Sequence, residues 1–528
     1  MPSSRTLQHA FGRGRASGQE GHDAVIGHDE VGHPCPRSAQ AAHIWHAACQ
    51  NNALIRPVAV VKHALMGHPY PMERLISAEL DSWLASRGRR TLVIRGARQV
   101  GKTWLVRDLA KRNSLDLVEA NFERSPHLAD IFTDASPHEV FRELSLLTGR
   151  ELRPETSLLF IDEIQVAPAV LSKLRWFTED FPELPVVAAG SLLEFALGEK
   201  GFSMPVGRVT YRFVEPLSFE EYLSAHDQEQ LLSRIRDWKP GEELGALVHK
   251  KAATYYERYS MVGGMPAAVS ADVEFDEPQM CRRIQTDLMA TYRDDFAKYV
   301  GRMDPRLLDI VLVSVAAQLG DKFVYSRAGE DVKYKQAKQS LELLALSRLV
   351  TLAPHSTAEG IPLGGAIDIG KRKAIFLDVG LAHAILRTPA VGAFPKLADL
   401  GPNIRGKLTE QLAGQQLRNP SPSLGDEPIL HYWQRSGGRP GEIDFLIEID
   451  QVIVPVELKA GASGSMKSLH QFMHDKQLEL AVRIDTNPPS VMDAEVRTTQ
   501  GDQATYRLLS LPGYMLWRVT QLVRGMKA

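Results

Sequence analysis

The chain has 528 residues, which at roughly 150 residues per domain predicts about three domains. Hydrophobic residues make up 44% and charged residues 24%, as in soluble globular proteins. The net charge of -2 and the isoelectric point of about 6.8 exclude a global electrostatic field that draws the chain onto nucleic acid. The three widely spaced cysteines, Cys35, Cys49 and Cys281, predict a reducing cytoplasm, and the apolar run 310–317 is too short to span a membrane.

Residues 1 to about 65 are rich in Gly, Ser, His and Arg and show little hydrophobic periodicity. We predict a disordered or low-complexity tail, because the stretch also lacks the apolar region of a signal peptide. His33 and Cys35 are metal-ligand types, but no second pair stands at zinc-site spacing. An alternative is that the natural protein starts at Met66 or Met72 and lacks this stretch.

The first ordered region alternates helices and strands. Apolar residues at helical spacing predict a helix over 73–84, and helices are also expected over 103–112 and 171–177. Short apolar runs predict buried strands over 91–94, 157–161 and 185–189. Because strands that alternate with helices form a parallel sheet covered on both faces, we predict an α/β core from about residue 70 to 215.

A phosphate-binding loop is predicted from Gly96 to Thr103, which fits G-x-x-x-x-G-K-[ST] between a strand and a helix. Glycines let backbone N–H groups ring a phosphate, and the helix N-terminus adds positive potential. Lys102 is expected to reach the β- and γ-phosphates, and Thr103 to offer its hydroxyl to Mg²⁺. The predicted ligands are ATP and Mg²⁺, and the predicted binding residues are Gly96, Ala97, Arg98, Gln99, Val100, Gly101, Lys102 and Thr103.

Two carboxylates end the second predicted strand. Asp162 is expected to hold the metal, and Glu163 to act as a catalytic residue beside Lys102 by polarising the attacking water. Alone, an acidic pair at a strand end is equally a solvated turn. Its position about 60 residues after the phosphate-binding loop favours the catalytic interpretation.

Three further residues each keep two interpretations. Ser191 follows the third strand, and either senses the γ-phosphate or caps a helix over 192–197. Arg208 and Arg212 follow a turn with Gly and Pro, and each is either an arginine finger for a neighbouring subunit or a solvated surface arginine.

From residue 216 the pattern becomes helical. Ser218 and Glu221 form a capping box that opens a helix over 219–224. Further helices are expected through 231–284, broken at the Gly-Gly-Met-Pro segment 263–266, and two helical runs fall within 306–350. We therefore predict a helical region over 216–305 and another region over 306–400.

Residues 405–511 are predicted to form the last region, with a helix over 408–417. Segments 442–450 and 451–459 both alternate apolar and polar residues, which predicts a β-hairpin with one buried face. If the turn centres on Asp450 and Gln451, then Asp444 lies opposite Glu457, and residue 442 lies opposite Lys459.

This hairpin gathers carboxylates and an ammonium on one face. Two close carboxylates repel unless a cation lies between them. Mg²⁺ held by Asp444 and Glu457 is one such cation, with Lys459 positioning a water or a phosphate. A cross-strand salt bridge on a solvated face is the alternative.

Several of these motifs resemble a family of prokaryotic AAA+-type ATPases whose C-terminal half is a domain of unknown function. The resemblance covers about residues 70–490, and it rests on the segments 96–103, 162–165 (Asp-Glu-Ile-Gln), 190–191 (Gly-Ser), 216–222 (Pro-Leu-Ser-Phe-Glu-Glu-Tyr), 263–266 and 376–381 (Phe-Leu-Asp-Val-Gly-Leu). It implies an AAA+-like P-loop sheet that hydrolyses ATP. Trp104 departs from the family's pattern, which has Thr there, but it lies beyond the phosphate cradle.

Two narrower resemblances concern the later regions. Residues 306–354 look like a winged helix, which implies either DNA binding or protein contacts through basic residues in or beside its last helix: Lys333, Lys335, Lys338 and Arg348. The hairpin resembles the PD-(D/E)XK nuclease core, with Asp444, Glu457 and Lys459 as its motif. Glu410 on the preceding helix is then the leading acid, and Gln471 an added helix residue. This implies an α/β restriction-nuclease-like C-terminal domain.

Three functions remain open on the sequence alone. The leading hypothesis is an Mg²⁺-dependent ATPase of AAA+ type. The second is a nuclease for DNA or RNA that ATP regulates, and the third is an ATP-gated switch that binds DNA or a protein. Relatives of this type often form rings, so the resemblance also implies a homo-oligomer, while no membrane is expected.

Overall fold

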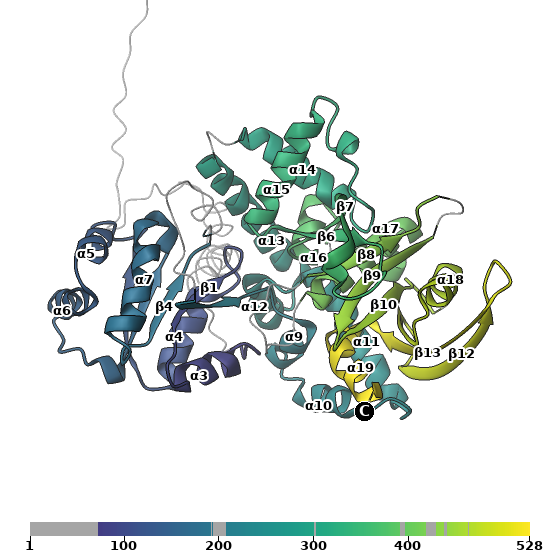
Figure 1. Cartoon of the computed structure of the whole chain (residues 1–528), viewed down its shortest axis with the longest axis horizontal. Helices are drawn as coiled ribbons and strands as arrows, with labels where there is room; N and C mark the ends of the chain where they lie inside the picture. Colours follow the sequence, from purple (N-terminus) through teal and green to yellow (C-terminus); the bar gives the residue numbers. More distant parts are fainter. Residues whose placement is uncertain are drawn as a thin grey trace, which may run out of the picture. The chain divides into compact units, whose positions relative to one another are not determined.

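The structure is a computed structural model (Figure 1) that describes residues 72–191, 193, 207–299, 303–390, 396–418, 429–437, 441–462 and 464–527. The tail predicted over 1–65, with His33 and Cys35, lies outside the described residues, as does all but residue 193 of the helix expected over 192–197. Within the described ranges, none of the helices has the length and apolar character that crossing a membrane demands.

Within the described residues, a parallel sheet of five strands forms the core predicted over 70–215, in the order β2-β3-β4-β1-β5. The strands are β1 (Thr91–Arg95), β2 (Asp116–Asn121), β3 (Ser157–Asp162), β4 (Val186–Ala189) and β5 (Val209–Phe213). Strands β1, β3 and β4 confirm the predicted ones. The sequence did not predict β2 and β5, because both are edge strands whose half-exposed residues form no continuous apolar run.

Helices cover both faces of this sheet because successive strand residues point to opposite sides. Leu92 and Ile94 pack towards α3 (Ser77–Ala85) and α4 (Lys102–Arg112). Val93 lies in a separate core with α5 (Leu128–Asp134), α6 (Pro137–Thr148) and α7 (Ala169–Asp180), which Figure 1 shows gathered together. The two-sided packing explains why β1, β3 and β4 are apolar throughout.

Helices dominate residues 219–346, as predicted. They are α9 (Phe219–Ala225), α10 (Glu229–Asp237), α11 (Ala246–Val262), α12 (Pro266–Phe275), α13 (Pro278–Asp295), α14 (Pro305–Ala317) and α15 (Tyr334–Leu346). The capping box is confirmed, since the Ser218 hydroxyl accepts from the Glu221 N–H and the Glu221 carboxylate accepts from the Ser218 N–H. The break is confirmed too, because Gly263 has φ +75° and Pro266 begins α12.

A second sheet of eight strands is formed by the later described residues, in the order β12-β13-β11-β10-β9-β8-β6-β7. Its strands are β6 (Val350–Ser356), β7 (Ile367–Phe376), β8 (His431–Gln434), β9 (Glu442–Ile449), β10 (Val452–Leu458), β11 (Leu480–Asp485), β12 (Ser490–Arg497) and β13 (Gln503–Pro512). The accompanying helices are α16 (Val379–Ile385), α17 (Pro402–Leu417), α18 (Lys467–Lys476) and α19 (Val519–Lys527).

The β6–β7 hairpin follows α14 and α15, the order expected of a winged helix. It does not stand alone, because His355 of β6 pairs with Tyr432 of β8. The sheet is therefore continuous across residue 400, where the sequence suggested a boundary between regions.

The hairpin of β9 and β10 turns at Asp450 and Gln451, both with positive φ, as the sequence predicted. The prediction of one buried face was wrong. Phe445 and Val454 face the core that contains α17, but Leu446 and Ile453 on the opposite face are also buried, against α18. Helices cover both sides of the sheet around this hairpin, so alternation of residue types does not reveal burial here.

Two of the family-like motifs meet around the buried carboxylate of Asp378. Its oxygens accept hydrogen bonds from the Gly264 N–H at 2.6 Å, the Leu381 N–H at 3.2 Å and the Gln415 amide at 2.9 Å. The Gly264 carbonyl in turn accepts from the Leu217 N–H at 2.7 Å. The carboxylate therefore ties the segment that leaves the first sheet to α16 and α17.

Substitution of Gly264 tests how tightly this junction is packed. A Cβ there would collide with the backbone carbonyl of Leu217, so we expect Gly264→Ala to destabilise the fold by about 2–3 kcal/mol in urea unfolding. Gly406→Ala is the matched control, because its Cβ meets open space within α17, and it should be neutral or slightly stabilising. Equal effects of the two substitutions would contradict the close packing.

Candidate functional site

The loop after β1 has the backbone shape of a phosphate cradle. Gly96, Gln99 and Gly101 all adopt positive φ, and Gly101 is the N-cap of α4. A Cβ on Gly96 would collide with the carbonyl of Val214, so glycine is required at that position. The loop thus turns before a helix N-terminus, where backbone N–H groups and the helix dipole favour an anion.

Lys102 folds back over this loop. Its Nζ donates to the carbonyls of Gly96 at 3.0 Å and Ala97 at 2.8 Å, and the side chain is almost fully buried. The ammonium therefore lies at the mouth of the cradle, where it can neutralise a bound phosphate.

The Thr103 hydroxyl and the Asp162 carboxylate come together, although 59 residues separate them in the chain. The hydroxyl donates to Asp162 at 3.2 Å, and the Asn121 amide donates to the same oxygen at 3.1 Å. Burial, followed by the neighbouring charge of Glu163, raises the pKa of Asp162 to about 6. The Thr103 hydroxyl and the Asp162 carboxylate are oxygen ligands of the kind that Mg²⁺ prefers. A cation would also offset the repulsion between the charges of Asp162 and Glu163.

Glu163 is held beside this pair in a left-handed conformation with φ +53°. Its carboxylate accepts from the Gln165 amide at 2.5 Å and from the Ser191 hydroxyl at 3.4 Å. Gly190 makes room for this arrangement, because a Cβ there would collide with the Gln165 side chain. The structure thus brings Ser191 to Glu163 from the end of the adjacent strand β4.

Arg74 supports the loop from outside, and the sequence analysis did not identify it. This buried side chain donates to the Val100 carbonyl at 3.0 Å and the Glu215 carbonyl at 2.8 Å, and pairs with Glu221 at 2.9 Å. Asn121 was missed as well, because it ends the unpredicted strand β2.

The loop also contacts α13. Arg98 pairs with Asp295 at 2.6 Å, and its carbonyl accepts from the Tyr292 hydroxyl at 2.5 Å. These two contacts of Arg98 connect the loop directly to the helical region.

Arg208 lies away from the cradle of its own chain, whereas Arg212 stands beside Ile94, near the end of the strand that leads into the loop. Arg208 immediately precedes β5, at the opposite end of that strand from the edge where β1 leads into the loop, and it pairs with Glu179 at 2.8 Å. Arg208 is 55% exposed, whereas Arg212 is less exposed and pairs with Glu79 at 3.0 Å.

The C-terminal acids gather only in part as the hairpin register predicted, because Glu442 pairs with a lysine of β7 and not with Lys459. The backbone pairing of the two strands extends as far as Val456↔Phe445, and Glu457 and Asp444 are the next residues on each strand. The Asp444 carboxylate accepts from the Leu458 N–H at 2.7 Å. Carboxylate oxygens of Glu410, Glu442 and Asp444 lie within 4.8 Å of one another.

A lysine from β7, which the sequence did not point to, enters this cluster. Nζ of Lys373 lies 2.5 Å from both Glu410 and Glu442. Burial disfavours the ammonium, but the charges of Glu410, Asp444 and Glu442 outweigh it and raise the pKa of Lys373 well above its ordinary value.

Glu457 stands at the other side of Asp444. One of its oxygens pairs with Nζ of Lys459 at 2.5 Å, and burial, with the charge of Asp444, raises the pKa of Glu457 to about 7. The other oxygen is buried and has no hydrogen-bond partner among the described residues. Gln471, the added helix residue suggested by the sequence, donates to Asp475 on its own helix α18.

The basic residues of the winged-helix-like region divide into two kinds. Lys333 and Lys335 are exposed at the start of α15, and Lys338 is half-buried one turn later. Arg348 instead stacks over the ring of Phe213 at 4.3 Å, so it is engaged with β5.

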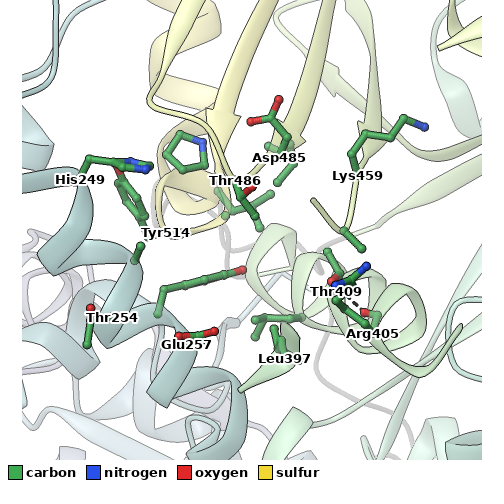
Figure 2. Close-up of a pocket in the computed structure, with 18 of the residues that line it drawn as sticks. His249, Thr254, Glu257, Leu397, Arg405, Thr409, Lys459, Asp485, Thr486 and Tyr514 are labelled. Carbon is green, nitrogen blue, oxygen red and sulfur yellow. Dashed lines mark hydrogen bonds between the residues drawn. The ribbon is translucent and has the colours of Figure 1, made fainter. Parts of the chain in front are cut away.

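A pocket of about 460 Å³ lies apart from the phosphate cradle, between α11 and α17 at the carboxyl ends of β10, β11 and β13 (Figure 2). Tyr256 and Leu412 contribute apolar surface, and Arg405 contributes a charge. Lys459 also lines it, although Figure 2 shows its ammonium pointing away from the α11 residues. This pocket was not predictable from the sequence, because its walls come from several distant segments.

Three families match parts of this chain. Residues 88–223 match the AAA domain, residues 253–391 match a domain of unknown function (DUF8612), and residues 405–498 match a domain of unknown function (DUF4143). Residues 88–223, which contain the five-stranded parallel sheet, are therefore similar to an AAA domain. The third match assigns no activity, so the nuclease-like core stays a prediction.

Similar solved structures give little beyond this. The Aeropyrum pernix ORC2 protein, solved as ADPNP-ADP complexes, is 15% identical, with 61% of this chain and 96% of that chain covered at a TM-score of 0.31. The Aeropyrum pernix ORC1 protein in complex with DNA is 15% identical, with 62% and 96% covered at 0.26. C. elegans PCH-2 is 14% identical, with 37% and 57% covered at 0.22. These scores are too low to carry an argument, and no curated protein matches the chain.

Loss of Arg74 tests its support of the loop. Arg74→Met leaves Glu221 buried without its charge partner, so we expect a loss of about 3–5 kcal/mol in urea unfolding. Arg107→Met is the matched control, because Arg107 is 59% exposed in its pair with Glu119 and should cost less than about 1 kcal/mol. If Arg74→Met costs no more than the control, Arg74 does not hold this region together.

Proposed function

We propose that this chain binds ATP with Mg²⁺ in the loop from Gly96 to Thr103 and hydrolyses it as an AAA+-type ATPase. The contact between the Thr103 hydroxyl and the Asp162 carboxylate carries this proposal. It joins the ends of β1 and β3, across the intervening β4, at the carboxyl edge of a parallel sheet. The match to the AAA domain over residues 88–223 supports it at the level of the family.

The residues of the loop have different roles in nucleotide binding. Backbone N–H groups from Ala97 to Thr103 surround the phosphates, and Lys102 leaves the Gly96 and Ala97 carbonyls to neutralise the β- and γ-phosphates. Thr103 and Asp162 would hold Mg²⁺, which supplies positive charge to the transferring phosphoryl group.

Glu163 is the proposed catalytic base. A carboxylate at this position can orient and polarise the water that attacks the γ-phosphate. Its hydrogen bonds to Gln165 and Ser191 fix its direction, so Ser191 is proposed to act on Glu163 as well as to sense the γ-phosphate.

Two substitutions separate binding from chemistry. Lys102→Ala should abolish ATP turnover, because the phosphate charge loses its partner. Glu163→Gln should keep ATP binding but lower kcat by about 100-fold or more, because the amide cannot accept the proton from water. Steady-state phosphate release with Mg²⁺ measures both.

Lys111→Ala is the matched control for this assay, because Lys111 is exposed on the same helix α4. Its turnover should equal that of the unchanged protein. Unchanged turnover in Lys102→Ala would rule out hydrolysis at this loop.

ATP-dependent control of another partner follows as part of the same proposal. The contacts of Arg98 with Tyr292 and Asp295 give the loop a direct connection to α13. A DNA, RNA or protein partner could bind to the region of Lys333, Lys335 and Lys338. Its affinity would then differ between the ATP-bound and the ADP-bound chain. The exposed Arg208 is available to the site of a neighbouring copy in a homo-oligomer.

A second candidate activity is metal-dependent cleavage of nucleic acid at Asp444, Glu457 and Lys459. The buried oxygen of Glu457 without a partner favours it, because such an oxygen needs either a proton or a cation. Mg²⁺ held by Asp444 and Glu457 would supply a polarised water, and Lys459 would steady the phosphate.

Cleavage of single- and double-stranded DNA and RNA tests this candidate. Glu457→Gln should lower a metal-dependent cleavage rate by about 100-fold or more, because the metal loses a charged ligand. Glu495→Gln, on the exposed face of β12, should leave the rate unchanged. If the unchanged protein is inert on all four polymers, this candidate is excluded while the ATPase proposal stands.

A further inference from the structure

We propose that Lys373 is the resident cation of the cluster formed by Glu410, Glu442 and Asp444, so that this cluster takes no divalent metal ion. The inference does not depend on ATP hydrolysis. It restricts any metal of the C-terminal domain to the side of Asp444 that faces Glu457.

The ammonium of Lys373 satisfies its donors within the cluster. An ammonium has three N–H groups. Nζ lies 2.5 Å from a carboxylate oxygen of Glu410, 2.5 Å from one of Glu442, and 3.5 Å from the backbone carbonyl of Asp444. Three oxygens therefore lie around the nitrogen, two of them from carboxylates that form ion pairs with it.

The surroundings suit an ammonium better than a hydrated metal ion. Nζ lies 5.2 Å from the centre of the Tyr432 ring and 5.8 Å from that of Phe445, and the Lys373 side chain is 2% exposed. Aromatic rings attract an ammonium but cannot ligate Mg²⁺, which keeps several waters in an octahedral shell. Gly320 closes the cluster further, since a Cβ there would lie 3.0 Å from a Glu410 oxygen.

Departure of the Lys373 ammonium from the cluster is unfavourable. The Lys373 backbone is fixed in β7, where it pairs with Ala353 of β6. Moving the ammonium away would leave Glu410 and Glu442, which are 15% and 37% exposed, in close approach without a cation, which is unfavourable. A divalent ion beside the ammonium would instead meet a like charge at close range.

The cluster therefore has two unlike sides. The side of Glu410 and Glu442 is filled by Lys373, and it fastens β7 to α17 and β9. On the other side, Asp444 faces Glu457, whose buried oxygen has no hydrogen-bond partner among the described residues. Glu410 is thus a partner of Lys373, where the nuclease resemblance implied a leading metal-site acid.

Binding of Mn²⁺ to the full chain without nucleotide tests this assignment, with the free ion measured by electron paramagnetic resonance. We expect Glu442→Gln to leave the Mn²⁺ affinity unchanged within about twofold, because the oxygen it alters binds Lys373. A tenfold or greater loss of affinity in Glu442→Gln would overturn the proposal. Loss in Glu457→Gln with no change in Glu442→Gln agrees with it and identifies the other side as the metal site.

Removal of the ammonium gives the complementary test. Lys373→Gln should bind Mn²⁺ at least tenfold more tightly than the unchanged chain does, and Lys373→Gln combined with Glu442→Gln should lose this gain. A folded Lys373→Gln chain without this gain would contradict the claim that the ammonium keeps metal out. If Lys373→Gln does not fold, the comparison of Glu442→Gln with the unchanged chain still decides.

Discussion

The buried carboxylate of Asp378 receives hydrogen bonds from the Gly264 N–H, the Leu381 N–H and the Gln415 amide. Burial raises the pKa of Asp378, and hydrogen bonds from these donors and from the Gly380 N–H oppose that rise by stabilising the charge. The same contacts hold α12, α16 and α17 to the segment that leaves the phosphate-binding sheet. Pro266, which begins α12, lies close to Gly101 of the phosphate-binding loop, so the loop and the later regions share one packed junction.

Two buried lysines show how surroundings decide what a cation does. Lys102 rests on backbone carbonyls, which are neutral and release it readily to a phosphate. Lys373 rests on carboxylates, whose negative charge holds the ammonium in the place of a metal ion. The same ammonium group therefore opens one site to an anionic ligand and closes the other to a cationic one. On this account, the phosphate cradle is the site of ligand chemistry, and the Glu410 side of the C-terminal cluster is a structural junction.

The features predicted from the sequence are local ones. The cradle follows from eight consecutive residues, and the register of the β9–β10 hairpin follows from alternation on either side of Asp450 and Gln451. The features that were missed depend on contacts between distant segments. Arg74 pairs with Glu221, which is 147 positions away in the chain. Lys373 on β7 pairs with Glu410 on α17. Asn121 was missed because an edge strand with polar residues has no distinctive pattern.

The most direct test of the account is whether nucleotide binding depends on Mg²⁺ through Thr103. Binding of a fluorescent ATP analogue is measured by titration with and without Mg²⁺, for the unchanged chain and for Thr103→Ala. The account predicts that Mg²⁺ tightens binding by about tenfold or more in the unchanged chain and has little effect in Thr103→Ala, because the hydroxyl next to Asp162 is a ligand of the metal. Equal Mg²⁺ dependence in both chains, or no binding in either, would contradict the assignment of this loop as the Mg²⁺–ATP site.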